Sequence, residues 1–180
     1  QINSLSLGMF DFGGISSFGN TYLRLNKGAN IENDGDGAIG GSIHFGSNRK
    51  FDKGSEIKCH FLGGSFDTYA LGIVSTISKK NWIYSLAFNK EMANNDFRYK
   101  NYKRIGHPIL TQSNSEFRST NLIQEFSFKF KKVKFKSVSW WNGKRKNIPQ
   151  LLTESQESKK FMADSSFRTV LKAKTYFGKI

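Results

Sequence analysis

The feature that most constrains this fold is a two-residue alternation of apolar and polar side chains that recurs after residue 55. Trp82, Tyr84, Leu86 and Phe88, for example, alternate with Ser85, Ala87 and Asn89. Successive side chains of a strand point to opposite faces, so this period predicts β-strands with two unlike faces. The alternation is clear in residues 68–78, 81–89, 119–131 and 167–177, and weaker in residues 56–66 and 133–142.

The six expected strands are long, at about nine to thirteen residues each, against a usual length of about five or six. From the second strand onward, the connections alternate between short and long: Lys79–Lys80, residues 91–119, Lys131–Lys132 and residues 142–166. Up-and-down barrels in outer membranes have short turns on one side and long loops on the other. The sequence therefore favours a transmembrane barrel, and a soluble antiparallel sheet remains the competing interpretation.

Aromatic side chains near the strand ends support the barrel interpretation. Trp82 lies near the start of one expected strand and Phe130 near the end of the next. Both would lie on the short-turn side, where an aromatic belt is expected at the membrane interface. No apolar stretch reaches the roughly 18 residues that a spanning helix needs.

The net charge of +14 at pH 7 raises a second functional hypothesis, a soluble basic β-sheet protein that binds polyanions. No RNP-like motif, helix-turn-helix pattern or zinc-finger spacing organises this charge, so we do not expect direct nucleic-acid binding. The single Cys59 excludes a disulfide framework. We expect no metal site, because the three histidines are far apart in sequence. No catalytic triad or carboxylate pair is visible, so we expect no enzyme.

Glycines are concentrated in residues 34–45, DGDGAIGGSIHF, just before an expected strand. Glycine permits positive φ and a close approach of another backbone, because it has no Cβ. Gly37 suits a sharp loop, whereas Gly40 and Gly41 suit a position where a neighbouring backbone presses against the strand start. Gly28 suits a turn after Lys27. We therefore expect the N-terminal part to pack as a small plug against a barrel wall.

Two N-terminal segments, YLRLNKG at residues 22–28 and GAIGGSI at 37–43, resemble the end of the plug domain in TonB-dependent outer-membrane receptors. NNDFRY at 94–99 and RKNIP at 145–149 resemble the first two long loops of the vitamin B12-receptor-like branch. The chain departs from the family at residues 31–35, IENDG, where the family usually has Ser-Xaa-Leu-Tyr-Gly. It also has Arg98 where the branch often has proline, and the family's full chain is several times longer.

The resemblance implies an all-β fragment in the bacterial outer membrane. Residues 1–50 would be the C-terminal part of a plug domain, and residues 51–180 about six antiparallel strands of an incomplete transmembrane β-barrel. The implied function is active uptake of a scarce, bulky nutrient such as a corrinoid or an iron chelate, without a cofactor. The implied partners are this nutrient, outer-membrane lipid and the inner-membrane energy-coupling protein TonB, which would bind the missing N-terminus. Six strands leave two open edges, so we do not expect the 180-residue chain alone to insert stably.

Three groups of residues follow as candidates for functional positions. The expected plug-exit glycines are Gly28, Gly37, Gly40 and Gly41. The expected ligand contacts in extracellular loops are Phe97, Arg98, Tyr99, Tyr102 and Arg145, for which a solvated loop surface is the competing interpretation. The polar residues expected to line the lumen or touch the plug are Asn89, Glu125, Lys129, Arg168 and Lys172.

Overall fold

The computed structural model describes residues 19, 22–28, 41–153 and 158–175, and the regular elements in this part of the chain are all β-strands. Within these ranges there is no helix long and apolar enough to cross a membrane. The all-β class predicted from the alternation is therefore confirmed.

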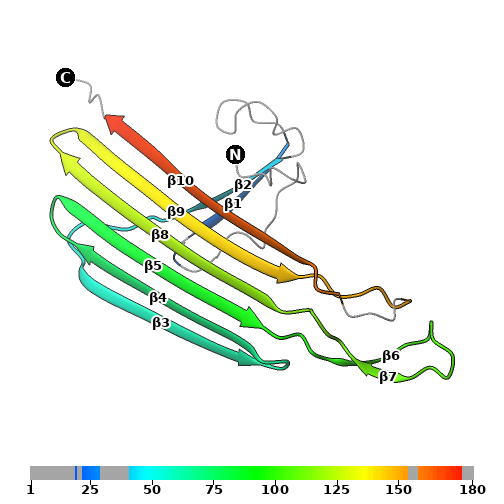
Figure 1. The fold of residues 1–180 in the computed structure, drawn as a ribbon. Helices are drawn as coiled ribbons and strands as arrows, with labels where there is room; N and C mark the ends of the chain where they lie inside the picture. Colours follow the sequence, from blue (N-terminus) through cyan, green and yellow to red (C-terminus); the bar gives the residue numbers. More distant parts are fainter. Residues whose placement is uncertain (1–18, 20–21, 29–40, 154–157, 176–180) are drawn as a thin grey trace.

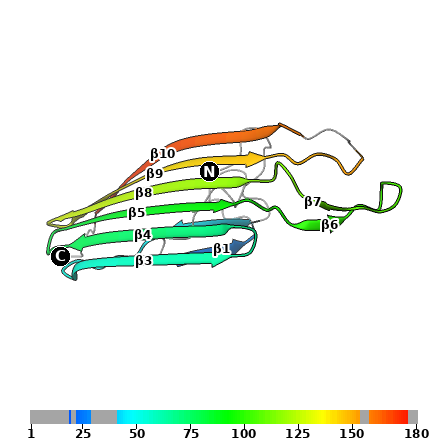
Figure 2. The ribbon, with the colours of Figure 1, turned by 60° about the horizontal axis from the view of Figure 1, so that its bottom comes forward.

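Six long strands form one antiparallel sheet with the spatial order β10-β9-β8-β5-β4-β3. Each of these strands pairs with the long strand that precedes or follows it along the chain, and β3 and β10 are the two edges of an open, curved sheet (Figures 1 and 2). The strands are β3 (Gly54–Gly64), β4 (Thr68–Ser78), β5 (Trp82–Ala93), β8 (Phe117–Phe130), β9 (Val133–Asn147) and β10 (Phe161–Thr175).

Two smaller antiparallel pairs accompany the sheet. β1 (Tyr22–Lys27) pairs with β2 (Gly41–Gly46) before the large sheet begins. β6 (Arg98–Lys100) pairs with β7 (Ile109–Thr111) inside the connection between β5 and β8. This second pair extends beyond one end of the sheet (Figure 1).

The connections give the sheet two different ends. Residues 79–81 and 131–132 make the turns at what we call the short-turn end. Residues 94–116 and 148–160 make the connections at the long-loop end, where the turn between β3 and β4 also lies, because the Asn94 amide donates to the Phe66 carbonyl at 3.0 Å. The predicted order of short, long, short and long connections is therefore confirmed.

The last two strands extend further toward the long-loop end than the sequence predicts. β9 was expected to end at residue 142 and continues to Asn147, and β10 begins at Phe161 instead of residue 167. The alternation fades in this polar segment, yet β9 stays paired with β8 and β10 on its two sides. Arg145 is therefore a strand residue, and its expected place in a loop is wrong.

Large apolar side chains collect on one face of the sheet, which we call the exposed face. Register places Ile73, Phe88, Leu122, Trp141 and Phe167 in one row across β4, β5, β8, β9 and β10. The opposite face, which we call the covered face, carries the alternating residues, such as Ser85 and Glu125. In the strands as described, the exposed face thus consists of the even-numbered positions of β5 and β8 and the odd-numbered positions of β3, β4, β9 and β10.

Burial in this sheet is inverted relative to an ordinary soluble sheet. The buried side chains of the six strands all lie on the covered face, and most are polar: Val74, Ser78, Ile83, Ser85, Ala87, Asn89, Ser119, Asn121, Glu125, Ser127 and Asn142. On the exposed face, by contrast, Phe126 is 43% and Phe167 70% exposed. A sheet in water normally buries its apolar face and solvates its polar one.

Candidate functional site

A connector, residues 47–53, leads from β2 to β3 and is hydrogen-bonded to the short-turn end of the sheet. The Asp52 amide donates to the Lys79 carbonyl at 3.1 Å. Ser78 lies between two connector residues: its hydroxyl accepts from the Lys53 amide at 3.3 Å and donates to the Lys50 carbonyl at 2.7 Å. The expected domain boundary at residue 50 falls within this connector.

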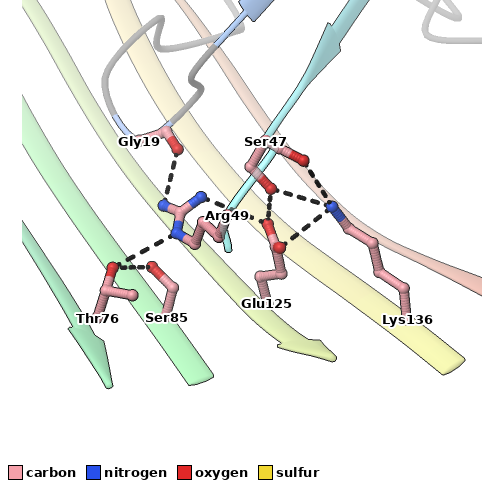
Figure 3. A network of polar contacts seen from close by, with 7 residues as sticks. All are labelled: Gly19, Ser47, Arg49, Thr76, Ser85, Glu125 and Lys136. Carbon is pink, nitrogen blue, oxygen red and sulfur yellow. Dashed lines mark hydrogen bonds and ion pairs between the residues drawn. The ribbon is translucent and has the colours of Figure 1, made fainter. Parts of the chain in front are cut away.

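Glu125 of β8 is the central residue where the connector meets the covered face (Figure 3). Its side chain is only 7% exposed and has two cationic neighbours. Lys136 Nζ of β9 lies 3.1 Å from Oε1, and Arg49 Nη1 of the connector lies 3.6 Å from Oε2. The Ser47 hydroxyl donates to Oε2. A buried carboxylate is costly unless it is paired and hydrogen-bonded, and Glu125 meets both conditions.

The same contacts extend across the covered face to β4 and β5. Lys136 Nζ also donates to the Ser47 carbonyl at 3.1 Å, and Arg49 Nη2 donates to the Gly19 carbonyl at 3.1 Å. Arg49 Nε donates to Thr76 Oγ1 at 3.4 Å, and Thr76 in turn shares a hydrogen bond with Ser85. We call this set the junction; it consists of Gly19, Ser47, Arg49, Thr76, Ser85, Glu125 and Lys136 (Figure 3).

A cavity of about 370 Å³ adjoins the junction on the covered face. Tyr22, Phe45 and Trp140 contribute aromatic walls. Among the described residues of its lining, the charged ones are mostly cations: Arg49, Lys134, Lys136, Lys172 and Lys174, against the acid Glu125. A low-dielectric cleft lined by one sign of charge concentrates ions of the opposite sign, so this cavity favours anionic over cationic solutes.

The five polar residues expected to face a lumen all lie on the covered face. Glu125 and Lys172 line the cavity. Asn89 is buried and donates to Glu91 Oε1 at 2.8 Å. Lys129 Nζ lies 5.3 Å from the ring centroid of Phe51 in the connector, and Arg168 is half-buried.

Of the predicted glycines, Gly37 and Gly40 lie outside the described residues. Gly28 follows β1 with a φ of 84°, and a Cβ there would meet no atom within 4 Å. Gly41 has a φ of 138°, and a Cβ there would lie 2.5 Å from the Asn26 carbonyl oxygen of β1. The close neighbour of Gly41 is thus β1, whereas the sequence suggested the wall of a barrel.

The described glycine that packs tightly against the sheet is Gly19, which the sequence analysis missed. Its φ is 95°, and a Cβ there would lie 2.6 Å from the Cβ of Ala87 on the covered face. Gly19 stands in the polar stretch SSFGNTY, outside any alternating segment. The local sequence therefore contains no signal for this contact.

The expected ligand-contact residues are distributed over several places at the long-loop end. The ring of Phe97 lies 5.9 Å from Phe66 and 6.3 Å from Tyr99, measured between centroids. Tyr102, at 68% exposure, is near Lys100 Nζ at 5.3 Å, and Arg98 is an exposed residue of β6. Arg145 lies in the sheet itself, so these residues do not converge on one pocket.

Buried and half-buried asparagines join the two long connections to each other. Asn101, with 1% exposure, donates to the Leu152 carbonyl at 2.8 Å. Asn114 donates to the carbonyls of Ile148 at 2.7 Å and Lys160 at 2.9 Å. The two long connections therefore form one hydrogen-bonded layer.

Metal chemistry finds no support in the part of the chain that is described, because no three His, Cys, Asp or Glu side chains gather there to hold an ion. No protein-family model and no curated protein matches the chain.

Proposed function

We propose that this chain is part of a TonB-dependent receptor of the bacterial outer membrane that takes up a scarce, bulky nutrient. Residues 1–50 would belong to the plug domain and residues 51–180 to the first strands of the barrel. The exposed face would contact lipid, and the covered face would surround the plug. The nutrient would be a corrinoid or an iron chelate, and energy would come from the inner-membrane protein TonB.

The observation that carries this proposal is the inverted burial of the six-stranded sheet. Buried polar residues such as Asn121 and Asn142 lie behind a face of exposed aromatic and aliphatic side chains. Membrane-spanning barrels have this arrangement, with apolar residues outward and polar residues inward. In water the same exposed face would be an aggregation hazard, because contiguous apolar patches beyond a few hundred Å² are rare on soluble monomers.

In this proposal, the junction would hold the end of the plug in place. In the receptor family that the sequence resembles, solute binds at extracellular loops and the plug then rearranges. Here the connector between the proposed plug and barrel is anchored by Glu125 through Arg49 and Lys136. Any movement of the plug end would have to exchange these ion pairs for water or for other partners. We therefore assign Glu125 a positioning role in holding the resting state.

The distribution of charge alone does not separate the polyanion-binding hypothesis from the proposed function. A polyanion binder concentrates cations on an accessible surface. Most cations of the six strands lie on the covered face. Lys136 pairs there with Glu125, whereas Lys58, Lys129, Lys146, Lys172 and Lys174 are exposed, so the inverted burial, and not the distribution of charge, favours the receptor.

The experiment that tests the proposed function is fractionation and uptake in cells that naturally produce the protein. We expect the protein in the outer-membrane fraction, and we expect its deletion to abolish high-affinity uptake of a labelled corrinoid or ferric chelate. Collapse of the inner-membrane proton gradient should have the same effect as the deletion. Recovery of the protein in a soluble fraction, with uptake of both solute classes unchanged, would contradict the proposal.

A further inference from the structure

The exposed face carries very few charges, and all of them lie together. Among the residues that the six strands place on this face, the charged ones are Lys90 of β5, Arg118 of β8 and Arg145 of β9. All three are cations, all three are exposed, and all three lie toward the long-loop end. The rest of the face is apolar or uncharged, so these cations mark one specific place.

Strand register brings the three cations close to one another. Arg118 stands directly opposite Arg145 across β8 and β9. Lys90 stands opposite Thr120, two residues from Arg118 on the same face, which is within diagonal reach of long side chains. A hollow of about 240 Å³ lies beside the arginine pair and is lined by Glu116, Arg118, Arg145 and Asn147.

This arrangement is unfavourable without an anion. Like charges directly opposite each other in a sheet destabilise it. Neither arginine has a carboxylate within ion-pair distance among the described residues. The nearby Glu116 instead accepts a hydrogen bond from Asn147 Nδ2 at 2.7 Å. The guanidinium of Arg145 lies 4.2 Å from the ring centroid of Phe161. The hollow therefore presents two fork-shaped donor groups and a surplus of positive charge, the arrangement that proteins use to bind phosphate.

We propose that Lys90, Arg118 and Arg145 bind the phosphate group of an anionic lipid. The inference rests on the proposed function, because it takes the exposed face to be in contact with lipid. The lipid's acyl chains would pass from this site along the apolar side chains nearer the sheet centre, including Leu122 and Trp141. A lipid fits better than a nucleic acid because the cations border an apolar surface and are confined to one end of it.

The test uses the receptor purified from its own outer membrane in a non-ionic detergent. Binding is measured for lipid A with both phosphates, for the same lipid with its phosphates removed, for inorganic phosphate and for a single-stranded oligonucleotide. The double variant Arg118→Gln/Arg145→Gln should bind bisphosphorylated lipid A at least tenfold more weakly, since hydrogen bonds to charged groups contribute about that factor each. The matched control is Lys80→Gln/Lys132→Gln, which removes two exposed cations at the short-turn end and should change the affinity less than twofold.

A second variant keeps the inference testable if the arginine variant does not assemble. Glu116→Gln removes the acid found among the described residues of the hollow, so lipid A should bind several-fold more tightly. Equal binding of lipid A with and without phosphate, equal loss in the control variant, or a preference for inorganic phosphate or the oligonucleotide would overturn the inference. Phosphate-independent binding by a protein that remains a lipid-embedded receptor would overturn this inference alone, whereas a protein soluble without detergent would overturn the proposed function.

Discussion

The two faces of the sheet differ in how polarity relates to burial, although they are made from the same strands. On the covered face, Ser127 is 2% and Glu125 6% exposed, yet both are polar. On the exposed face, Phe126, which lies between them in β8, is 43% exposed. The difference means that other segments of the chain pack closely on the polar face, whereas in the described structure no segment packs on the apolar face. In the proposed receptor, lipid would cover the apolar side and the plug would occupy the polar side.

The largest effect should follow from breaking the charge balance of the covered face. Glu125→Gln leaves Arg49 and Lys136 without their carboxylate, and loss of one partner of a buried pair costs about 3–5 kcal/mol. This loss of stability would be measured as the amount of connector that an added protease cleaves at increasing concentrations of denaturant.

The matched control for that variant is Glu56→Gln. Register places Glu56, Thr76, Ser85 and Glu125 in one row of the covered face. Glu56 is 62% exposed, and within the described ranges it pairs only with the exposed Lys58, so its replacement should change stability by less than about 1 kcal/mol. Equal losses in the two variants would mean that the junction does not hold the connector.

A charge placed on the exposed face should have the next largest effect. Leu122→Arg puts a cation near the middle of β8, and a cation at the midplane of a barrel's lipid face costs about 2–4 kcal/mol. The expected result is a reduced yield of folded protein in lipid vesicles. Ile109→Arg, at 62% exposure on the β6–β7 pair beyond the sheet, should fold as well as the parent. An unaffected Leu122→Arg would show that this face meets water.

An effect of about the same size as that of Leu122→Arg should follow from disturbing the fit between Gly19 and the covered face. Gly19→Ala forces a Cβ against Ala87 and also places alanine at a positive φ, so we expect a loss of about 2–4 kcal/mol. Gly54→Ala has a similar positive φ of 78° but open space around it, so only about 1–2 kcal/mol should be lost. Chemical denaturation of both variants gives the comparison.

A second replacement sharpens that test. Adding Ala87→Gly to Gly19→Ala removes the Cβ of residue 87 with which the new side chain clashes. The double variant should therefore lose only about as much stability as Gly54→Ala. The two sites are in contact, so a double-mutant cycle of Gly19→Ala and Ala87→Gly should give a coupling energy of about 0.5–3 kcal/mol. Strictly additive effects would mean that Gly19 does not pack on Ala87.

Much of the sheet could be predicted because its strands carry their own signal. In β5, Trp82, Tyr84, Leu86 and Phe88 specify both a strand and its apolar face through period alone. The turns at 79–81 and 131–132 follow from the short spacing between such segments. The end of β9 could not be predicted, because residues 143–147, GKRKN, have no alternation and owe their conformation to pairing with β8 and β10.

The junction could be predicted only in part. The expectation that Glu125 faces the inside follows from its alternation with Phe126. Its partners could not be identified, because Arg49 lies in a connector without periodicity and Lys136 is one of many lysines in the chain. Their convergence depends on strand register and on the path of residues 47–53, both of which are long-range properties. The hydrogen bonds of Asn101 and Asn114 escaped notice for the same reason.

The most direct test of the central claim uses the three tryptophans, because they sample both faces. Trp82 and Trp141 lie on the exposed face, and Trp140, next to Trp141 in the chain, lies on the covered face and lines its cavity. Three variants of the whole receptor, each retaining one of these tryptophans with every other tryptophan replaced by Phe, are reconstituted in vesicles whose acyl chains carry bromine. Our account predicts strong quenching of Trp82 and Trp141 fluorescence and little quenching of Trp140. Quenching of Trp140 as strong as that of Trp141, or no quenching of any of the three, would contradict it.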